Sequence, residues 1–244
     1  MAARIVTWNL EWATPRSNTE RRIRSLIESL NADVLVLTEA SLETVPENGY
    51  VIAAEGSWGY EPRSPSMRKV FMWSKEPWAN VTSTGPDLMP GGRFVTGATR
   101  TPDGVINVMG VCIPWKDAHV RTGLRNRSPW EDHRTYIESL QPLLASAKSP
   151  FVVAGDFNQK IPRKTAPRDV AELLLTAFGD TNIVTESSGD AALIDHVALS
   201  GDLVGELSQV LPRADGEGKL SDHLGAVVDF GFGTLATDKS NGSQ

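Results

Sequence analysis

A short apolar run that ends in Gly155-Asp156-Phe157-Asn158 places a carboxylate and an amide close together in the chain. Residues 151–154 have the small and β-branched composition of a buried strand, and the glycine after them permits a sharp turn. Taken alone, the pattern is typical of a turn in which Asp156 and Asn158 bond their own backbone. It also suits chemistry, because strand ends are where a rigid scaffold presents functional groups.

Other apolar runs of the chain adjoin side chains of the same kinds. They lie next to amide, carboxylate or imidazole groups at Asn9 with Glu11, at Glu39, at Asp195 with His196, and at Asp222 with His223. Each position alone has an ordinary explanation, as a turn cap or a solvated surface residue. Together they favour a shared site, and an oxygen-rich cluster without cysteine suits a hard cation such as Mg²⁺ or Mn²⁺.

The composition is that of an ordinary globular protein, with 40% hydrophobic and 22% charged residues among 244. A net charge of −6 argues against indiscriminate binding of polyanions, although it leaves room for a nuclease whose basic groups are local. The single cysteine, Cys112, excludes an internal disulfide. Because no apolar run resembles a signal peptide or approaches the ~18 residues of a membrane span, we expect a soluble cytoplasmic protein.

Strand signals outnumber helix signals along the chain. Capping-box spacing predicts helices over residues 18–30 and from Pro129 onward, and a third is expected over 169–178. Strands are expected over residues 4–8, 33–38, 50–54, 70–74, 94–100, 105–111, 151–154, 193–200, 206–211 and 225–230. This order predicts two packed sheets with helices on their outer faces. We expect one domain over residues 1–234, a flexible tail over 235–244 and a long surface loop over 114–129.

The ordered motifs resemble the endonuclease/exonuclease/phosphatase superfamily, which includes DNase I-like nucleases. The resemblance rests on Trp8-Asn9-Leu10-Glu11, Thr38-Glu39, Gly155-Asp156-Phe157-Asn158, Ile194-Asp195-His196 and Ser221-Asp222-His223, and Gly92-Arg93-Phe94-Val95-Thr96 resembles the family's central strand. It implies an α/β fold, a four-layer α/β/β/α sandwich in which two packed mixed β-sheets are flanked by helices. It also implies hydrolysis of a phosphoester with a divalent metal, Mg²⁺ or Mn²⁺, at one edge of the sheets.

The resemblance assigns metal-binding roles to four of these residues. It makes Glu39 the principal metal ligand, with help from Asn9. It places Asp222 near the metal or a second cation, and makes Glu11 an outer or second-metal carboxylate. The expected arrangement is therefore a cation site around Glu39.

Four further residues receive catalytic roles from the resemblance. Asp156 would position or deprotonate the attacking water, and Asn158 would hold a phosphate oxygen. His223 would contact the phosphate or the nucleophile, while Asp195 orients its imidazole ring. These roles agree with the chemistry, because attack on an anionic phosphoester needs charge neutralisation and positioning.

One position departs from the family pattern. Where relatives place a His or Tyr that contacts the phosphate or leaving group, this chain has Cys112, which we expect to be a small buried residue. The missing contact would then come from His119, Lys116 or Arg125 in the loop that follows. Trp115 borders the expected site, where its indole could stack on a base or sugar.

The leading functional hypothesis is a metal-dependent phosphodiesterase that acts as an endo- or exonuclease on DNA or RNA. Arginines in the loop over residues 114–129 and basic residues after Asn158 favour nucleic acid, whereas the net charge of −6 speaks against it. The alternatives are a phosphatase or phosphodiesterase of small phosphorylated metabolites or lipid head groups, and a catalytically silent binding module of the same fold. The sequence indicates no protein partner.

Overall fold

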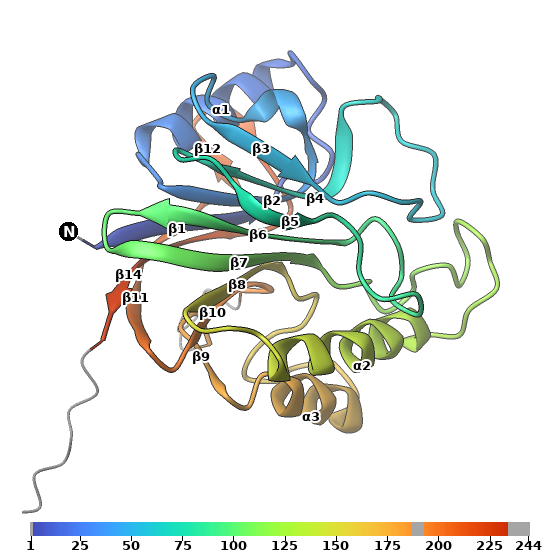
Figure 1. Ribbon diagram of the computed structural model, residues 1–244. Coiled ribbons are helices and arrows are strands. Elements are labelled where there is room, and N and C mark those ends of the chain that lie inside the picture. The colour runs from blue at the N-terminus through green and yellow to red at the C-terminus, as the bar shows by residue number, and fades with distance from the viewer. Residues whose placement is uncertain (1, 187–192, 234–244) are drawn as a thin grey trace, which may run out of the picture.

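A computed structural model describes residues 2–186 and 193–233, which form two stacked six-stranded sheets (Figure 1). The first sheet has, in spatial order, β11 (Leu203–Leu211), β14 (Gly225–Phe232), β1 (Ala3–Asn9), β2 (Val34–Ser41), β4 (Met67–Ser74) and β3 (Tyr50–Ala53). The second has β5 (Ala79–Thr82), β6 (Phe94–Thr101), β7 (Gly104–Cys112), β8 (Phe151–Asp156), β10 (Asp195–Ser200) and β9 (Thr181–Ile183). A separate ribbon pairs β12 (Ala214–Asp215) with β13 (Gly218–Lys219).

Both sheets are mixed, and their facing sides form the central core. β1 runs parallel to β2 and β7 runs parallel to β8, while the other paired strands are antiparallel. Because successive side chains of a strand point to opposite faces, Val152 and Ala154 of β8 lie between the sheets and Val153 lies outside. The inner layer is rich in β-branched residues, which pack well on a pleated surface.

Helices cover the outer face of each sheet (Figure 1). α1 (Asn18–Ser29) lies on the first sheet, where Ile23 and Ile27 join a buried cluster with residues of β1 and β2. Ser17 caps this helix by accepting a hydrogen bond from the Glu20 amide at 3.1 Å, as its capping box predicts. α2 (Glu131–Ala145) and α3 (Arg168–Ala177) lie together on the second sheet. A short 3₁₀ helix, η1 (Leu42–Thr44), follows β2.

The four-layer α/β/β/α sandwich is therefore confirmed, and the differences from expectation are local. α2 begins at Glu131 and not at Pro129, because Trp130 has a left-handed φ of 69° that a helix cannot include. The short strands β5 and β9 and the β12–β13 ribbon were not expected; β9, β12 and β13 have only two or three residues, too few for a pattern to detect. The tail expected to be flexible lies outside the described residues. Within the described ranges, no helix is both long and apolar enough to cross a membrane.

Candidate functional site

Several motif residues lie where strands of the two sheets end or begin at one edge of the sandwich. Asn9 ends β1 and Asp156 ends β8, while Asp195 opens β10 directly opposite Asp156 in the strand register. Gly155 makes this end of β8 possible. Its φ is +143°, and a side chain there would place a Cβ only 1.9 Å from the carbonyl oxygen of Val111.

The segment that precedes β14 is tied to the end of β1. Ser221 donates a hydrogen bond from its hydroxyl to the carbonyl of Asn9 at 2.6 Å, and its Oγ accepts one from the backbone N–H of His223 at 3.1 Å. The indole of Trp8 donates to the carbonyl of His223 at 3.1 Å. These bonds hold His223 between the two sheets, beside the residues of β8 and β10.

The buried carboxylate of Asp156 is held by two amide side chains. Asn9 and Asn158 each donate from Nδ2 to Asp156 Oδ2, at 3.0 and 2.8 Å, and the backbone N–H of Asn158 donates to Oδ1 at 2.8 Å. Burial raises the pKa of Asp156 to about 7, although the nearby His223 lowers it in part. A carboxylate with this pKa is a competent proton acceptor near neutral pH.

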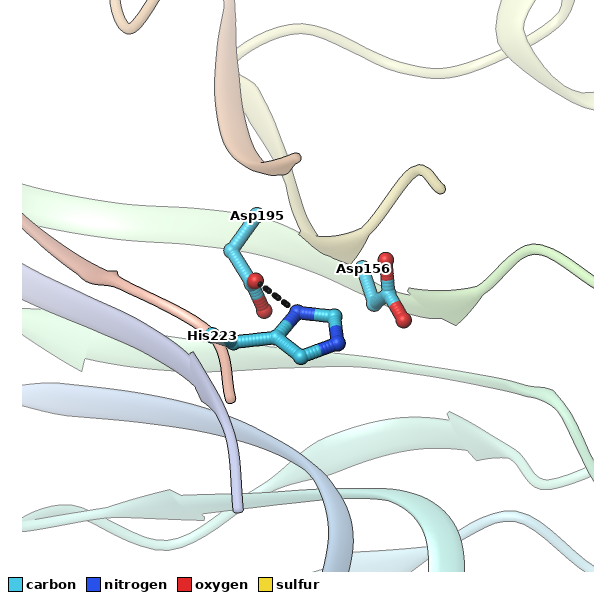
Figure 2. Close-up of side chains that lie close together, drawn as sticks. All are labelled: Asp156, Asp195 and His223. Atoms are coloured by element: carbon cyan, nitrogen blue, oxygen red, sulfur yellow. Dashed lines mark hydrogen bonds and ion pairs between the residues drawn. The ribbon is translucent and has the colours of Figure 1, made fainter. Parts of the chain in front are cut away.

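Asp195 and His223 form the expected hydrogen-bonded pair, with Nδ1 of the ring 2.6 Å from Asp195 Oδ2 (Figure 2). Burial works to lower the pKa of His223, but the charges of Asp195 and Asp156 outweigh it and raise that pKa to about 10. Burial raises the pKa of Asp195, and the charged imidazole opposes this rise. The ring therefore carries a positive charge at neutral pH and is aimed by a buried carboxylate.

Figure 2 shows the ring of His223 between two carboxylates, with Asp156 on the side away from Asp195. One ligand atom from each of these three residues lies within 4.8 Å of the others, a spacing that could suit a metal. A protonated imidazole has no lone pair to offer a cation, however. We therefore interpret this trio as a hydrogen-bonding and proton-holding group, with cation binding assigned elsewhere.

A cleft of about 560 Å³ opens in front of this trio. Glu39 and Asp222 line it together with Asn9, Asp156 and His223. Glu39 lies inside β2, two residues before its end at Ser41 and not at the strand end expected from the sequence. It has a left-handed φ of 47°, and its Oε1 lies 2.5 Å from Nζ of Lys69. Three of the four residues to which the family resemblance assigns metal-binding roles thus share one cleft, and Glu39 stands apart from the trio.

The donor set of the cleft fits a hard divalent cation. Glu39, Asp222 and Asn9 offer carboxylate or amide oxygens, the ligands that Mg²⁺ and Mn²⁺ prefer. Glu39 is paired with the ammonium group of Lys69, so a cation held by Glu39 would share or replace that ion pair. Burial is the main cause of the raised pKa of Asp156.

Four expected site residues do not line the cleft: Asp195, which is joined to it through His223, and Glu11, His119 and Arg125. Glu11 is half exposed and its Oε2 lies 2.5 Å from Nζ of Lys219, so it does not join Glu39. His119 is buried, bonds the carbonyl of Trp58 at 3.0 Å and accepts from the Leu124 amide at 3.1 Å. These bonds make it a packing residue of its loop. Arg125 is exposed and does not line the cleft.

Trp115 does line the cleft, with 45% of its surface exposed. Asn158 also lines it, but its Nδ2 donates both to Asp156 and to the carbonyl of Ile113 at 2.9 Å. Both N–H groups of that amide are thus engaged. Asn158 is therefore better placed to hold Asp156 than to hold a phosphate oxygen.

Apart from Trp115, sequence reasoning assigned no role to the basic and aromatic groups of the cleft. Lys69 and Arg93 line it, and Trp12 and Trp58 stack against each other on its wall with ring centroids 6.0 Å apart. Lys69 lies on β4, where its neighbours on both sides follow the strand pattern, so nothing local marks it as functional. Arg93 stands in the Gly92-Arg93 motif, which could have drawn attention to it.

Comparison with known proteins identifies the family and the fold. The family model described as "Endonuclease/Exonuclease/phosphatase family" matches residues 6–223. No curated protein sequence matches the chain. The endonuclease domain of TRAS1, a telomere-specific non-LTR retrotransposon, has 15% identity and a TM-score of 0.64 over 95% of this chain and 99% of its own. An AP endonuclease from Archaeoglobus fulgidus has 15% identity and a TM-score of 0.64 over 93% and 98%.

A third similar structure is beta toxin from Staphylococcus aureus, a mutant with bound magnesium ions. It has 15% identity and a TM-score of 0.59 over 94% of this chain and 99% of its own. At this identity the solved structures establish the fold. The family model covers the end of β1 at Asn9 and the segment that carries His223. The chain belongs to the endonuclease/exonuclease/phosphatase family of phosphoesterases.

Proposed function

We propose that this protein is a divalent-metal-dependent phosphoester hydrolase whose leading substrate is a phosphodiester of DNA or RNA. The observation that carries the proposal is the meeting of the Asp156 carboxylate and the Asp195–His223 pair at a single cleft. A buried carboxylate with a pKa near 7 beside a charged imidazole is a costly arrangement, which a structural role would not require.

A cation in the cleft would be held by Glu39, with Asn9 and Asp222 as further oxygen donors. When bound, Mg²⁺ or Mn²⁺ supplies neutralisation of the phosphate charge and lowers the pKa of a coordinated water. Glu11 is not part of this set, because its carboxylate is paired with Lys219.

Asp156 serves as the proton acceptor for the attacking water. Its two amide partners, Asn9 and Asn158, fix the carboxylate in one orientation, so no reorganisation is needed when the reaction begins. A pKa of about 7 lets it accept a proton near neutral pH and release it again.

His223 stabilises negative charge as it develops on the phosphoryl oxygens. Asp195 binds Nδ1, which leaves Nε2–H as the donor that faces the cleft beside Asp156. The hydrogen bond between His223 Nδ1 and Asp195 is of the stronger charge-assisted kind, because the imidazole is charged and the Asp195 carboxylate is buried.

Two observations bear on the substrate. Trp115 is nearly half exposed at the rim, where its indole can stack on a base, and this favours nucleic acid. The cleft volume of about 560 Å³ lies within the range of small-molecule sites, which keeps a small phosphorylated metabolite or lipid head group as the second candidate. The arginines of the loop over residues 114–129 give less support than expected, because Arg125 lies outside the cleft.

The deciding experiment measures hydrolysis of single- and double-stranded oligonucleotides, a bis-aryl phosphodiester and a panel of small phosphoesters with Mg²⁺, Mn²⁺ or EDTA. We expect metal-dependent turnover that Asp156→Asn abolishes and that Asp169→Asn, an exposed control on α3, leaves unchanged. Cleavage of oligonucleotides should fall steeply as salt rises, since phosphate contacts release counterions. Turnover of small esters alone would replace the nuclease with the second candidate, and no turnover at all would leave a silent binding module.

A further inference from the structure

Arg93 is a buried cation with which no carboxylate in the described part of the chain forms an ion pair. It lies just before β6, is 2% exposed and lines the cleft. Only its Nη1 has protein partners among the described residues, a 3.4 Å hydrogen bond to the carbonyl of Cys112 and a 3.7 Å contact to Cys112 Sγ. Burial of a guanidinium is costly unless it is paired, so this group is poised for an anion from outside the protein.

Lys69 is a second buried cation in the same cleft. Its Nζ lies 2.5 Å from Glu39 Oε1, and also 4.9 Å from the ring centre of Trp12 and 5.9 Å from that of Tyr60. The register pairs Thr38 with Val70, so Glu39 and Lys69 lie beside each other on neighbouring strands. The rings of Trp12 and Tyr60 contact the ammonium group independently of Glu39. The ammonium group can therefore keep its position if an oxygen of another anion replaces the Glu39 carboxylate.

Cys112 connects the two cations. Burial raises the pKa of its thiol to about 12, while the charges of Lys69 and Arg93 act in the opposite direction. The thiol is thus neutral, and it lies close enough to both cations for their charges to act on its pKa. Its small sulfur is the atom that Arg93 Nη1 contacts, so a bulkier side chain at this position would meet the guanidinium.

We propose that Arg93 and Lys69 form a binding site for the phosphoryl oxygens of the substrate, in place of the contact that position 112 no longer supplies. The planar guanidinium offers two parallel N–H donors to two oxygens, and the ammonium adds a point charge. This inference rests on the proposed function for the identity of the anion. It adds that phosphoryl binding does not require the divalent metal.

The test is binding of phenylphosphonate, which cannot be hydrolysed, measured by titration calorimetry in EDTA at low salt. Wild-type protein should bind, and Arg93→Gln should weaken binding roughly ten- to a hundredfold, as loss of a charge-assisted contact predicts. Arg100→Gln is the matched control, because Arg100 lies near the far end of β6, the strand that follows Arg93, and is exposed. Arg93→Lys should restore part of the affinity.

Lys69→Gln keeps the test decisive if Arg93→Gln does not fold, as judged by circular dichroism. A folded Lys69→Gln protein should bind phenylphosphonate several-fold more weakly. Wild-type protein that hydrolyses esters with metal but does not bind phenylphosphonate in EDTA would overturn this inference alone. Equal affinities for wild type and the folded Arg93 and Lys69 variants would do the same. Binding in EDTA without any metal-dependent hydrolysis would instead remove the proposed function.

Discussion

Replacing Asp195 with asparagine should flatten the dependence of stability on pH between pH 7.5 and 10 in metal-free protein. The pKa of His223 is about 10 in the folded state, against 6.5 for an ordinary histidine. Between these values the folded state holds a proton that the unfolded chain has released. Stability from this pair is therefore fully present below about pH 6.5 and is lost as pH rises through about 10.

The magnitude follows from the same values. A tenfold change in proton affinity corresponds to about 1.4 kcal/mol, so the raised pKa of His223 gives an upper bound of roughly 5 kcal/mol. Removing one partner of a buried ion pair typically costs about 3–5 kcal/mol, which agrees. Asp156 does not disturb this window. The raised pKa of Asp156, about 7, means that its protonated form stabilises the folded state at low pH. That contribution to the stability of the protein is lost as pH rises from about 4 to 7, below that window.

The assay is urea unfolding in EDTA at pH 7.5 and pH 10, followed by tryptophan fluorescence. Wild-type protein should lose several kcal/mol between the two values, and Asp195→Asn should lose much less, because the amide cannot hold the imidazole in its charged form. Asp229→Asn is the control, since it removes an ion pair with Arg4 that keeps its charge in this range. An equal loss in wild type and Asp195→Asn would refute the assigned coupling.

Three further outcomes are expected. Glu39→Gln should reduce Mg²⁺- or Mn²⁺-dependent turnover at least roughly a hundredfold, with little change in melting temperature, because the amide oxygen still accepts from Lys69. In steady-state assays, Asp195→Asn should lower kcat by about 10²- to 10⁴-fold with KM nearly unchanged, since it upsets the aim of the imidazole and not binding. Trp115→Ala should raise KM for oligonucleotides about five- to a hundredfold and leave turnover of a bis-aryl phosphodiester unchanged, as loss of base stacking predicts.

The fold could be predicted from the sequence because its signals are local and repeated. The apolar run before Asp156 gives a buried strand, and Ser17 with Glu20 gives a helix start that the structure contains. What could not be predicted depends on single backbone angles or on short pairings. The left-handed conformation of Trp130, which delays α2, leaves no mark in the residue types around it.

The site divides in the same way. The pairing of His223 with Asp195 was expected from the family pattern, and the structure brings the two groups to 2.6 Å. The pairing of Glu11 with Lys219 was not foreseen, because it depends on where the β12–β13 ribbon folds back toward the end of β1. Contacts between segments about 200 residues apart have no signature in either segment alone.

Net charge gives little guidance to the substrate of this protein, because the charges that matter are buried in one cleft. A chain of net charge −6 still presents Arg93, Lys69 and a charged His223 to that cleft. A charge in the low-dielectric interior acts far more strongly on a bound phosphate than an exposed lysine does. Under the proposed function, these buried charges would bind the phosphoryl group, and exposed residues of the cleft would distinguish a nucleic acid from a small ester. Trp115 is the rim residue whose exposure can decide it.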